Sequence, residues 1–173
     1  GGLIDAIDRV GHIPLPPHIK RHDEESDRDR YQTVYARDRG SVAAPTAGLH
    51  FTAAHLAALA ARAIEVAQIT LHVGYGTFKP VKVDHVEEHV VEAERYTVST
   101  GAAAALTRAR RERRRTIAVG TTTVRTLEYL TVKPDGTVVA DSGDTNLFIH
   151  PGHQFQLVDA MITNFHLPRS SLL

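Results

Sequence analysis

Three short stretches constrain the fold of this chain more than any other feature, because each joins a turn-prone segment to an apolar run. They are residues 44–52 (APTAGLHFT), 70–78 (TLHVGYGTF) and 162–168 (ITNFHLP). Each has a histidine at or near the join. Enzymes of the α/β class keep their sites at the ends of strands and the starts of helices. Together the three stretches indicate an α/β protein with a functional site at these joins.

The composition limits the classes of protein to consider. A length of 173 residues suits one domain, and an apolar fraction of 42% is enough for a sizeable core. The absence of cysteine excludes disulfides, zinc–thiolate sites and a cysteine nucleophile. We expect no membrane span, no secretory signal and a cytoplasmic protein, because no apolar run is long enough to span and the N-terminus lacks a basic region followed by an apolar stretch. The formal net charge is zero, so any contact with nucleic acid must use a local patch.

Strand-like and helix-like segments alternate, which predicts an α/β fold with a mostly parallel sheet flanked by helices. We expect residues 1–173 to form a single domain, complete or not. Thr52 and Thr100 are the expected helix caps, and residues 20–30 read as a solvated charge run. Helices are expected over 3–10, 53–63, 101–114 and from 121 through 130. Strands are expected over 66–73, 96–98, 116–119, 147–149 and 157–163, and Pro134-Asp135-Gly136 predicts a β-hairpin over 131–140.

One candidate binding segment follows the strand expected at 116–119. Gly120 lets the backbone approach a ligand, and the free amides at the start of the next helix favour an anion. Thr121 and Thr122 open that helix, and Arg125, one turn in, is placed to clamp the same carboxylate or phosphate. A well-capped helix without a ligand explains the segment equally well, so both interpretations stay open.

Two further segments favour a flat ligand. Gly74 and Gly76 flank Tyr75, so the backbone can approach the ligand while Tyr75 or Phe78 stacks on it. His72 lies on an apolar strand, where a histidine is more often a structural residue than a catalyst. In the last stretch, Asn164 suits a nucleobase or ribose edge, and His166 is a candidate proton carrier. The alternative for that stretch is a strand that ends in an Asn turn before proline.

The histidines and arginines raise two more questions. None of the eleven histidines begins an HExxH motif, so we expect no metal site. Six arginines between residues 108 and 115 form the strongest charge feature. The members of this arginine run are Arg108, Arg110, Arg111, Arg113, Arg114 and Arg115. A solvated helix face and a contact with a phosphate backbone explain the run equally well.

Longer motifs resemble one known family over nearly the whole chain. They are GHIPLPP at 11–17, YQTVYA at 31–36, VAAPTAGLHF at 42–51, TLHVG at 70–74, GTF at 76–78, AVGTT at 118–122, VR at 124–125 and ITNFHLP at 162–168. These motifs resemble the S-adenosylmethionine:tRNA ribosyltransferase-isomerase (QueA) family. Members are roughly twice as long, so the resemblance implies the main α/β domain of that fold, with a smaller β-rich domain largely absent.

The resemblance implies an activity in queuosine biosynthesis. The family transfers the ribosyl part of S-adenosylmethionine to 7-aminomethyl-7-deazaguanine at the wobble position of certain tRNAs. The ribose is isomerised, which gives epoxyqueuosine and releases adenine and methionine. S-adenosylmethionine is therefore a ribosyl-donating substrate, no cofactor or metal is implied, and tRNA is the macromolecular partner. The oligomeric state stays open, with a monomer favoured.

The resemblance also carries the candidate site onto this sequence. Proton transfer is assigned to His50, His72 and His166. Substrate binding is assigned to Thr46, Phe51, Gly74, Gly76, Thr77, Phe78, His89, Glu94, Gly120, Thr121, Thr122, Arg125, Asn164 and Phe165. Tyr75 and Glu92 depart from the family pattern, which usually has a small residue and a histidine there.

Three other interpretations remain beside this one. The departures at Tyr75 and Glu92 support a diverged member that binds a nucleoside without this activity. The arginine run supports an RNA-binding module without catalysis. The histidines are the support for a metal hydrolase.

Overall fold

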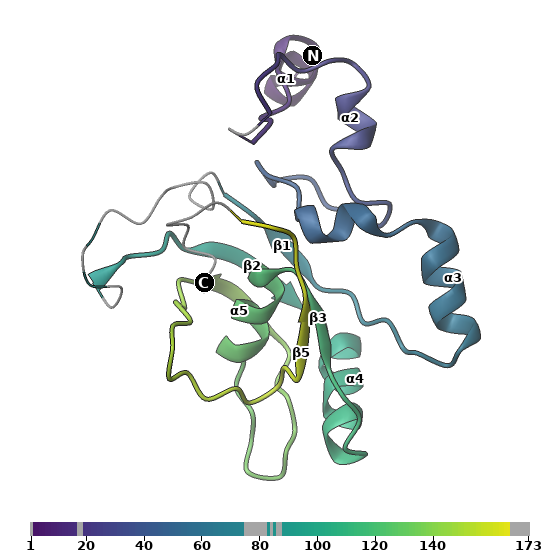
Figure 1. The fold of residues 1–173 in the computed structure, drawn as a ribbon, viewed down its shortest axis with the longest axis vertical. Helices are drawn as coiled ribbons and strands as arrows, with labels where there is room; N and C mark the ends of the chain where they lie inside the picture. The colour runs from purple at the N-terminus through teal and green to yellow at the C-terminus, as the bar shows by residue number, and fades with distance from the viewer. Residues whose placement is uncertain (1, 17–18, 75–82, 84, 86–87, 167–173) are drawn as a thin grey trace.

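The computed structural model describes residues 2–16, 19–74, 83, 85 and 88–166. Eleven short elements follow one another along these residues, and they confirm the expected α/β class (Figure 1). In chain order they are α1 (Leu3–Val10), α2 (Asp27–Arg30), the 3-10 helix η1 (Thr46–His50), α3 (Ala53–Ala61), β1 (Thr70–His72), β2 (Glu94–Val98), α4 (Thr100–Arg111), β3 (Ile117–Val119), α5 (Thr121–Tyr129), β4 (Asp141–Thr145) and β5 (Ala160–Ile162). No helix of the described residues combines the length and apolar character that a membrane span requires.

The strands form two small sheets, and the expectation of mostly parallel pairing is wrong for the described residues. β2 is the centre of a three-stranded sheet in which β1 and β4 both pair antiparallel with it. Only β3 and β5 pair in parallel, with Val119 opposite Ile162. The chain between β3 and β5 includes α5 and β4, so it is long enough for the crossover that parallel pairing requires.

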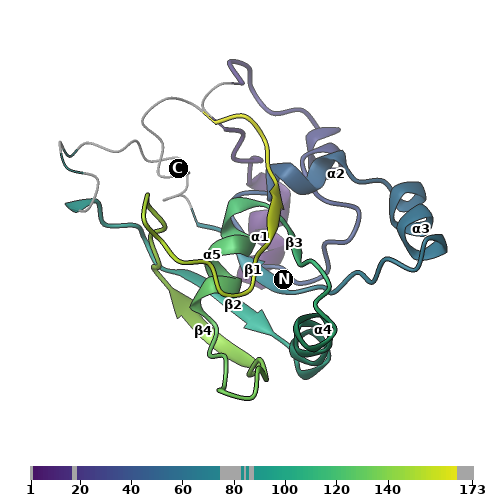
Figure 2. The same cartoon turned by 60° about the horizontal axis from the view of Figure 1, so that its bottom comes forward.

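The core lies between β2 and the two longer helices. β2 alternates buried and exposed residues, so Tyr96 and Val98 point inward together with Glu94. They pack with Leu106 of α4 and with Val124 and Leu127 of α5. Each fully buried aliphatic side chain contributes about 1.5–3 kcal/mol. Figures 1 and 2 show α5 beside the sheets and α4 along one flank.

Two of the expected helix starts are set by side-chain caps. Thr52 caps α3 in a reciprocal capping box with His55, as the sequence predicts. The cap of α4 is Ser99, one residue before the predicted Thr100, and its hydroxyl accepts from the amide of Ala102.

The hairpin over 131–140 is confirmed in a minimal form. Val132 and Val138 form a single antiparallel bridge around the turn at Pro134-Asp135-Gly136. Thr107 holds the hairpin to α4, because its buried hydroxyl donates to the Ala103 carbonyl and accepts from the Val138 amide. β4 follows directly and was not predicted, since its sequence DSGDT has no apolar alternation.

Three predicted strands are clearly shorter than expected or missing, and a specific contact or chain turn accounts for each. Residues 66–69 are irregular because β2 turns into the cap of α4 after Val98 and offers no further partner. Residues 147–149 form no strand, because the carbonyl of Leu147 accepts from Arg125 instead of a neighbouring strand. β5 begins at Ala160 rather than 157, because Glu128 binds the amides of residues 156–158.

Within the charge run at 20–30, Asp27 is buried rather than solvated. Both its oxygens accept from Arg21, at 2.7 and 2.8 Å, and Oδ2 also accepts from the Glu24 amide. These hydrogen bonds lower the pKa of Asp27 from 3.8 to about 2, and the bond from Arg21 has the largest effect. The ionised carboxylate therefore pins the turn that starts α2.

We predict that Asp27→Asn removes a pH-dependent part of the stability. A lowered folded-state pKa stabilises the fold fully above the unfolded value of 3.8, and that stabilisation is lost as the pH falls toward about 2. Thermal unfolding of wild type and variant should differ most above pH 4 and converge near pH 2. Asp29→Asn, an exposed change on the same helix, is the control. A constant difference at every pH would contradict the prediction.

Candidate functional site

A buried ion pair joins α5 to one end of the three-stranded sheet. Arg125 Nη1 lies 3.2 Å from Glu94 Oε2, and the two side chains are 8% and 4% exposed. Arg125 Nε donates to the Leu147 carbonyl at 2.9 Å. Nη2 is buried with no hydrogen-bond partner within the described part of the chain. Burial lowers the pKa of Arg125 and Glu94 opposes that shift, and the guanidinium stays charged because arginine is not deprotonated in proteins.

The sequence places this pair through simple periodicity. Glu94 opens β2 on the same inward face as Tyr96, directly opposite the buried Thr145 at the end of β4. Thr145 also accepts from the amide of Leu147 and so turns the chain toward Arg125. The end of β1 reaches the same place, since His72 pairs with Arg95 and the next residue lies opposite Glu94.

An aromatic pair continues this cluster. The rings of His89 and Phe148 meet edge to face with centroids 5.3 Å apart. Phe148 directly follows Leu147, whose carbonyl binds Arg125, so the aromatic pair adjoins the Glu94–Arg125 contact along the chain. We call His89, Glu94, Arg125 and Phe148 the sheet-end cluster. Three of its four members are predicted site residues.

The predicted anion segment lies at the amino end of α5. Gly120 adopts φ +96°, a conformation that favours glycine, and its amide donates to the Ile162 carbonyl at 2.8 Å. This bond seats the start of α5 beside the end of β5, because parallel strands end at the same edge. Thr121 and Thr122 are four and three residues before Arg125 and so share its side of the helix.

The last stretch leaves β5 at this same edge. Asn164 is half-buried and its Oδ1 accepts from the amide of the adjacent Phe165 at 2.9 Å, and the described residues 163–166 form no turn. The Phe165 side chain is fully exposed at 101%. Burial lowers the pKa of His166 below its usual 6.5. Burial therefore favours the neutral imidazole of His166, the form that accepts a proton.

The first two stretches meet at the end of β1. The amides of Val42 and Ala43 both donate to the carbonyl of Val73, at 3.0 and 3.2 Å, just before the chain enters residues 44–52. His72 and Gly74 are half-buried there. Within 44–52, Thr46 and His50 begin and end η1, and Phe51 contacts His55 edge to face. His50 is exposed.

Some predicted residues are not placed by the structure. Gly76, Thr77 and Phe78, with the departure at Tyr75, lie outside the described residues. The second departure, Glu92, is described and exposed.

The arginine run serves the fold more than the site. Four of its members bind neighbouring segments: Arg108 and Arg114 pair with Glu65, Arg111 pairs with Asp135, and Arg110 donates to the Gln156 carbonyl. The run also precedes β3, whereas Gly120 follows it, so the two lie at opposite ends of that strand. This arrangement favours the structural interpretation over a phosphate contact.

Sequence reasoning missed two contributors to this region. Phe148 lies in a segment that the sequence predicts to be a strand, and no local sequence signal marks its contact with His89. Glu128 is completely buried and accepts from the amides of Gln156, Leu157 and Val158 at 2.7–3.0 Å, which fixes the approach to β5. Its position on the apolar side of α5 was an available signal. Within the described residues, no three His, Asp or Glu side chains gather as a metal site would require.

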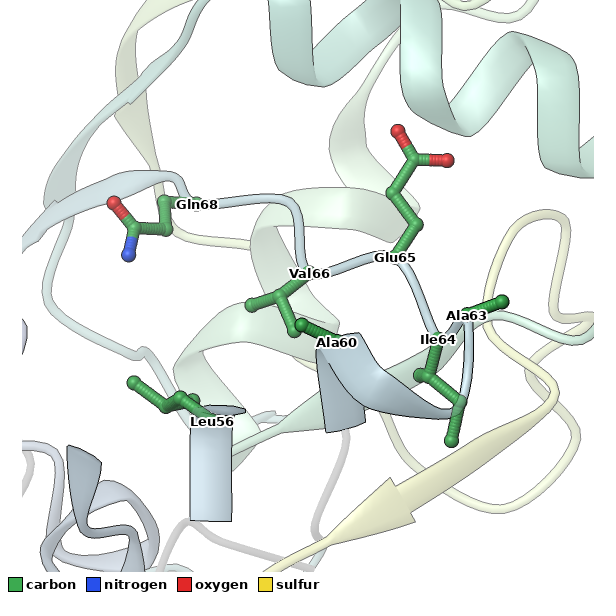
Figure 3. A pocket seen from close by; sticks show the side chains of 7 residues that line it. All are labelled: Leu56, Ala60, Ala63, Ile64, Glu65, Val66 and Gln68. Carbon is green, nitrogen blue, oxygen red and sulfur yellow. The ribbon is translucent and has the colours of Figure 1, made fainter. Parts of the chain in front are cut away.

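Two open hollows lie elsewhere. One, of about 510 Å³, lies between α3 and the segment after it, and Leu56, Ile64 and Val66 supply much of its apolar wall (Figure 3). The other, of about 570 Å³, lies between α4 and the hairpin beside Arg108 and Arg111. Neither is lined by a predicted site residue, so the convergence of the three stretches identifies the candidate site better than hollow size does.

Comparison with known proteins decides the family. Residues 2–173 match the family described as "Queuosine biosynthesis protein". The chain belongs to this family. It is 53% identical over 172 residues to the S-adenosylmethionine:tRNA ribosyltransferase-isomerase of Geobacter sulfurreducens, covering 99% of this chain and 50% of that one. The Moorella thermoacetica enzyme of the same name is 55% identical over 167 residues, covering 96% and 48%.

A solved structure agrees with this family assignment. S-adenosylmethionine tRNA ribosyltransferase from Thermotoga maritima is 40% identical, with a TM-score of 0.55, and the match covers 73% of this chain and 38% of that one. The chain thus spans about half the length of the curated relatives it matches.

We predict that breaking the Glu94–Arg125 pair destabilises the fold far more than breaking a surface pair. Arg125→Met leaves a buried carboxylate without its cation and should cost about 3–5 kcal/mol in urea unfolding. Adding Glu94→Gln should recover part of that loss. The control is Arg95→Gln, whose pair with Asp144 is 71% and 57% exposed and should be worth about 0–1 kcal/mol. Equal losses for Arg125→Met and Arg95→Gln would contradict the prediction.

Proposed function

We propose that this chain serves the reaction named for its relatives. In that reaction the ribosyl part of S-adenosylmethionine moves to 7-aminomethyl-7-deazaguanine at the tRNA wobble position, giving epoxyqueuosine, adenine and methionine. The observation that carries the proposal is the placement of α5: its Arg125 belongs to the sheet-end cluster, and the Gly120–Thr122 turn at its start is bonded to the end of β5. S-adenosylmethionine is the ribosyl donor, and the proposal includes no separate cofactor and no metal.

The chemistry asks for particular groups, and the candidate site offers them. The sulfonium acidifies the adjacent 5′ carbon, so a neutral base must remove a proton there. His166 suits this role, because burial keeps its pKa below the usual value. His50 and His72 are the other candidate proton carriers. They can assist the departure of adenine or keep the attacking amine of the deazaguanine neutral.

The two ends of S-adenosylmethionine require different contacts. Its methionine carboxylate is an anion, and Arg125 Nη2 is a buried cationic donor without a partner within the described part of the chain. The threonine hydroxyls and amides at the start of α5 lie on the same side of that helix. Within the described residues Asn164 Nδ2 donates to no other group, which suits a base edge, while Phe165 presents an open aromatic face for stacking.

The decisive measurement is adenine release from S-adenosylmethionine, with and without tRNA carrying 7-aminomethyl-7-deazaguanine. Mass analysis of the nucleosides should find epoxyqueuosine only with that tRNA. The full-length Geobacter sulfurreducens relative is the positive control. A folded chain that releases no adenine under conditions where the relative does so would refute the proposal for this chain.

We predict that His166→Gln lowers this adenine release by about 10²–10⁴-fold, the usual contribution of a general base. His22→Gln is the matched control, because His22 is exposed and lies far from the stretch in sequence. Circular dichroism should show both variants folded. If His166→Gln turns over like His22→Gln, another group is the base.

A further inference from the structure

A segment that links the motif at 31–36 to the start of the motif at 42–51 is fastened along the edge of β1. We call residues 38–43 the strap. Asp38 accepts from the Thr70 hydroxyl at 3.0 Å. Ser41 Oγ donates to the Leu71 carbonyl at 3.3 Å and accepts from the Val73 amide at 2.7 Å. With the two amides that bind the Val73 carbonyl, the strap is tied to β1 before, beside and after His72.

The middle of the strap lies against the His72 ring. Gly40 adopts φ +134°, in the region that favours glycine. A Cβ atom on Gly40 would lie 2.7 Å from His72 Nδ1 and 3.0 Å from Cε1, closer than side-chain carbons approach other atoms. The absence of a side chain at residue 40 is therefore what lets the strap and the imidazole occupy their positions together.

We propose that the strap is a positioning element for His72, with Gly40 as its point of contact. This inference rests on the proposed function, in which His72 carries a proton. Packing against Gly40 restricts rotation of the ring about its side-chain bonds. It also covers the edge that bears Nδ1 and leaves Nε2 on the far side as the nitrogen that meets a substrate. Gly40 acts on the reaction only through the histidine.

The strap also connects two of the three stretches. Its last residues bind the Val73 carbonyl and lead directly into residues 44–52, while its middle holds the histidine of residues 70–78. A displacement of the strap therefore moves η1 and His72 together. A loop that merely linked α2 to η1 would need neither the glycine conformation nor the two bonds from Ser41.

The test follows the imidazole itself, by NMR of the 173-residue chain. The His72 signals are assigned by their loss in His72→Asn. Gly40→Ala should shift them, while Gly152→Ala should leave them in place. Gly152 is the matched control, because it also has positive φ, +101°, yet an added Cβ meets nothing within 4 Å. Gly40→Ala should also lower Tm more than Gly152→Ala, and His72→Ala should abolish that excess.

A second variant keeps the proposal testable if Gly40→Ala does not fold. Ser41→Ala removes the hydroxyl that ties the strap to β1 and should shift the same His72 signals. Ser142→Ala, which removes an exposed hydroxyl from β4 in the same sheet, should not. Unchanged His72 signals in folded Gly40→Ala, or in Ser41→Ala where Gly40→Ala is unfolded, would overturn the proposal.

This readout is separate from the activity, because it needs no substrate. Shifted His72 signals without adenine release in the wild type would refute the proposed function and leave the strap as a positioning element. If the wild type releases adenine but the strap variants leave the His72 signals unchanged, the positioning role of the strap is refuted and the proposed function stands.

Discussion

The arrangement of the candidate site depends on one buried ion pair, Glu94–Arg125. Two desolvated charges are costly to bury, and the 3.2 Å contact with the bond to Leu147 offsets that cost only in this geometry. The pair therefore fixes where α5 stands against β2 and where the chain turns after β4. A buried ion pair is weak evidence that it adds to the stability of the fold. It does, however, fix the position of α5 relative to β2. Here that position holds Arg125 Nη2 in a water-excluded place.

A second carboxylate on the same helix completes the arrangement. Glu128, less than one turn after Arg125, takes three successive amides and so decides where the chain can begin to pair as β5. Through the Gly120–Ile162 bond, the end of β5 then meets the start of α5. Nine residues of helix thus hold the sheet-end cluster, the anion segment and the last histidine stretch in one place. Polar side chains, rather than apolar packing alone, set this geometry.

The local parts of the fold could be predicted from the sequence, and the non-local parts could not. The Thr52 cap, the turn at Pro134-Asp135-Gly136 and the helix after Gly120 each carry a signal within a few residues. Strand ends at 157–160 and the loss of a strand at 147–149 were set by Glu128 and Arg125 from α5, which no window of sequence reveals. β4 was not predicted, because its polar sequence forms a strand only where it pairs with β2. For the site, Glu94 and Arg125 were predicted as substrate contacts, whereas their pairing with each other was not.

The three stretches are connected to the rest of the candidate site by the elements that lie between them in the chain. Residues 44–52 and 70–78 are joined by a strap whose bonds all go to β1, and residues 162–168 are joined to the first helix turn of α5 by a single backbone bond. Neither connection requires an unusual residue type, except where a backbone passes directly over an imidazole. Gly40 stands at that point, and its conformation is tolerated because five flanking hydrogen bonds hold the strap in place. A glycine at positive φ that packs against a histidine ring, in a loop with no other need for it, is the arrangement expected of a chain that positions a proton carrier.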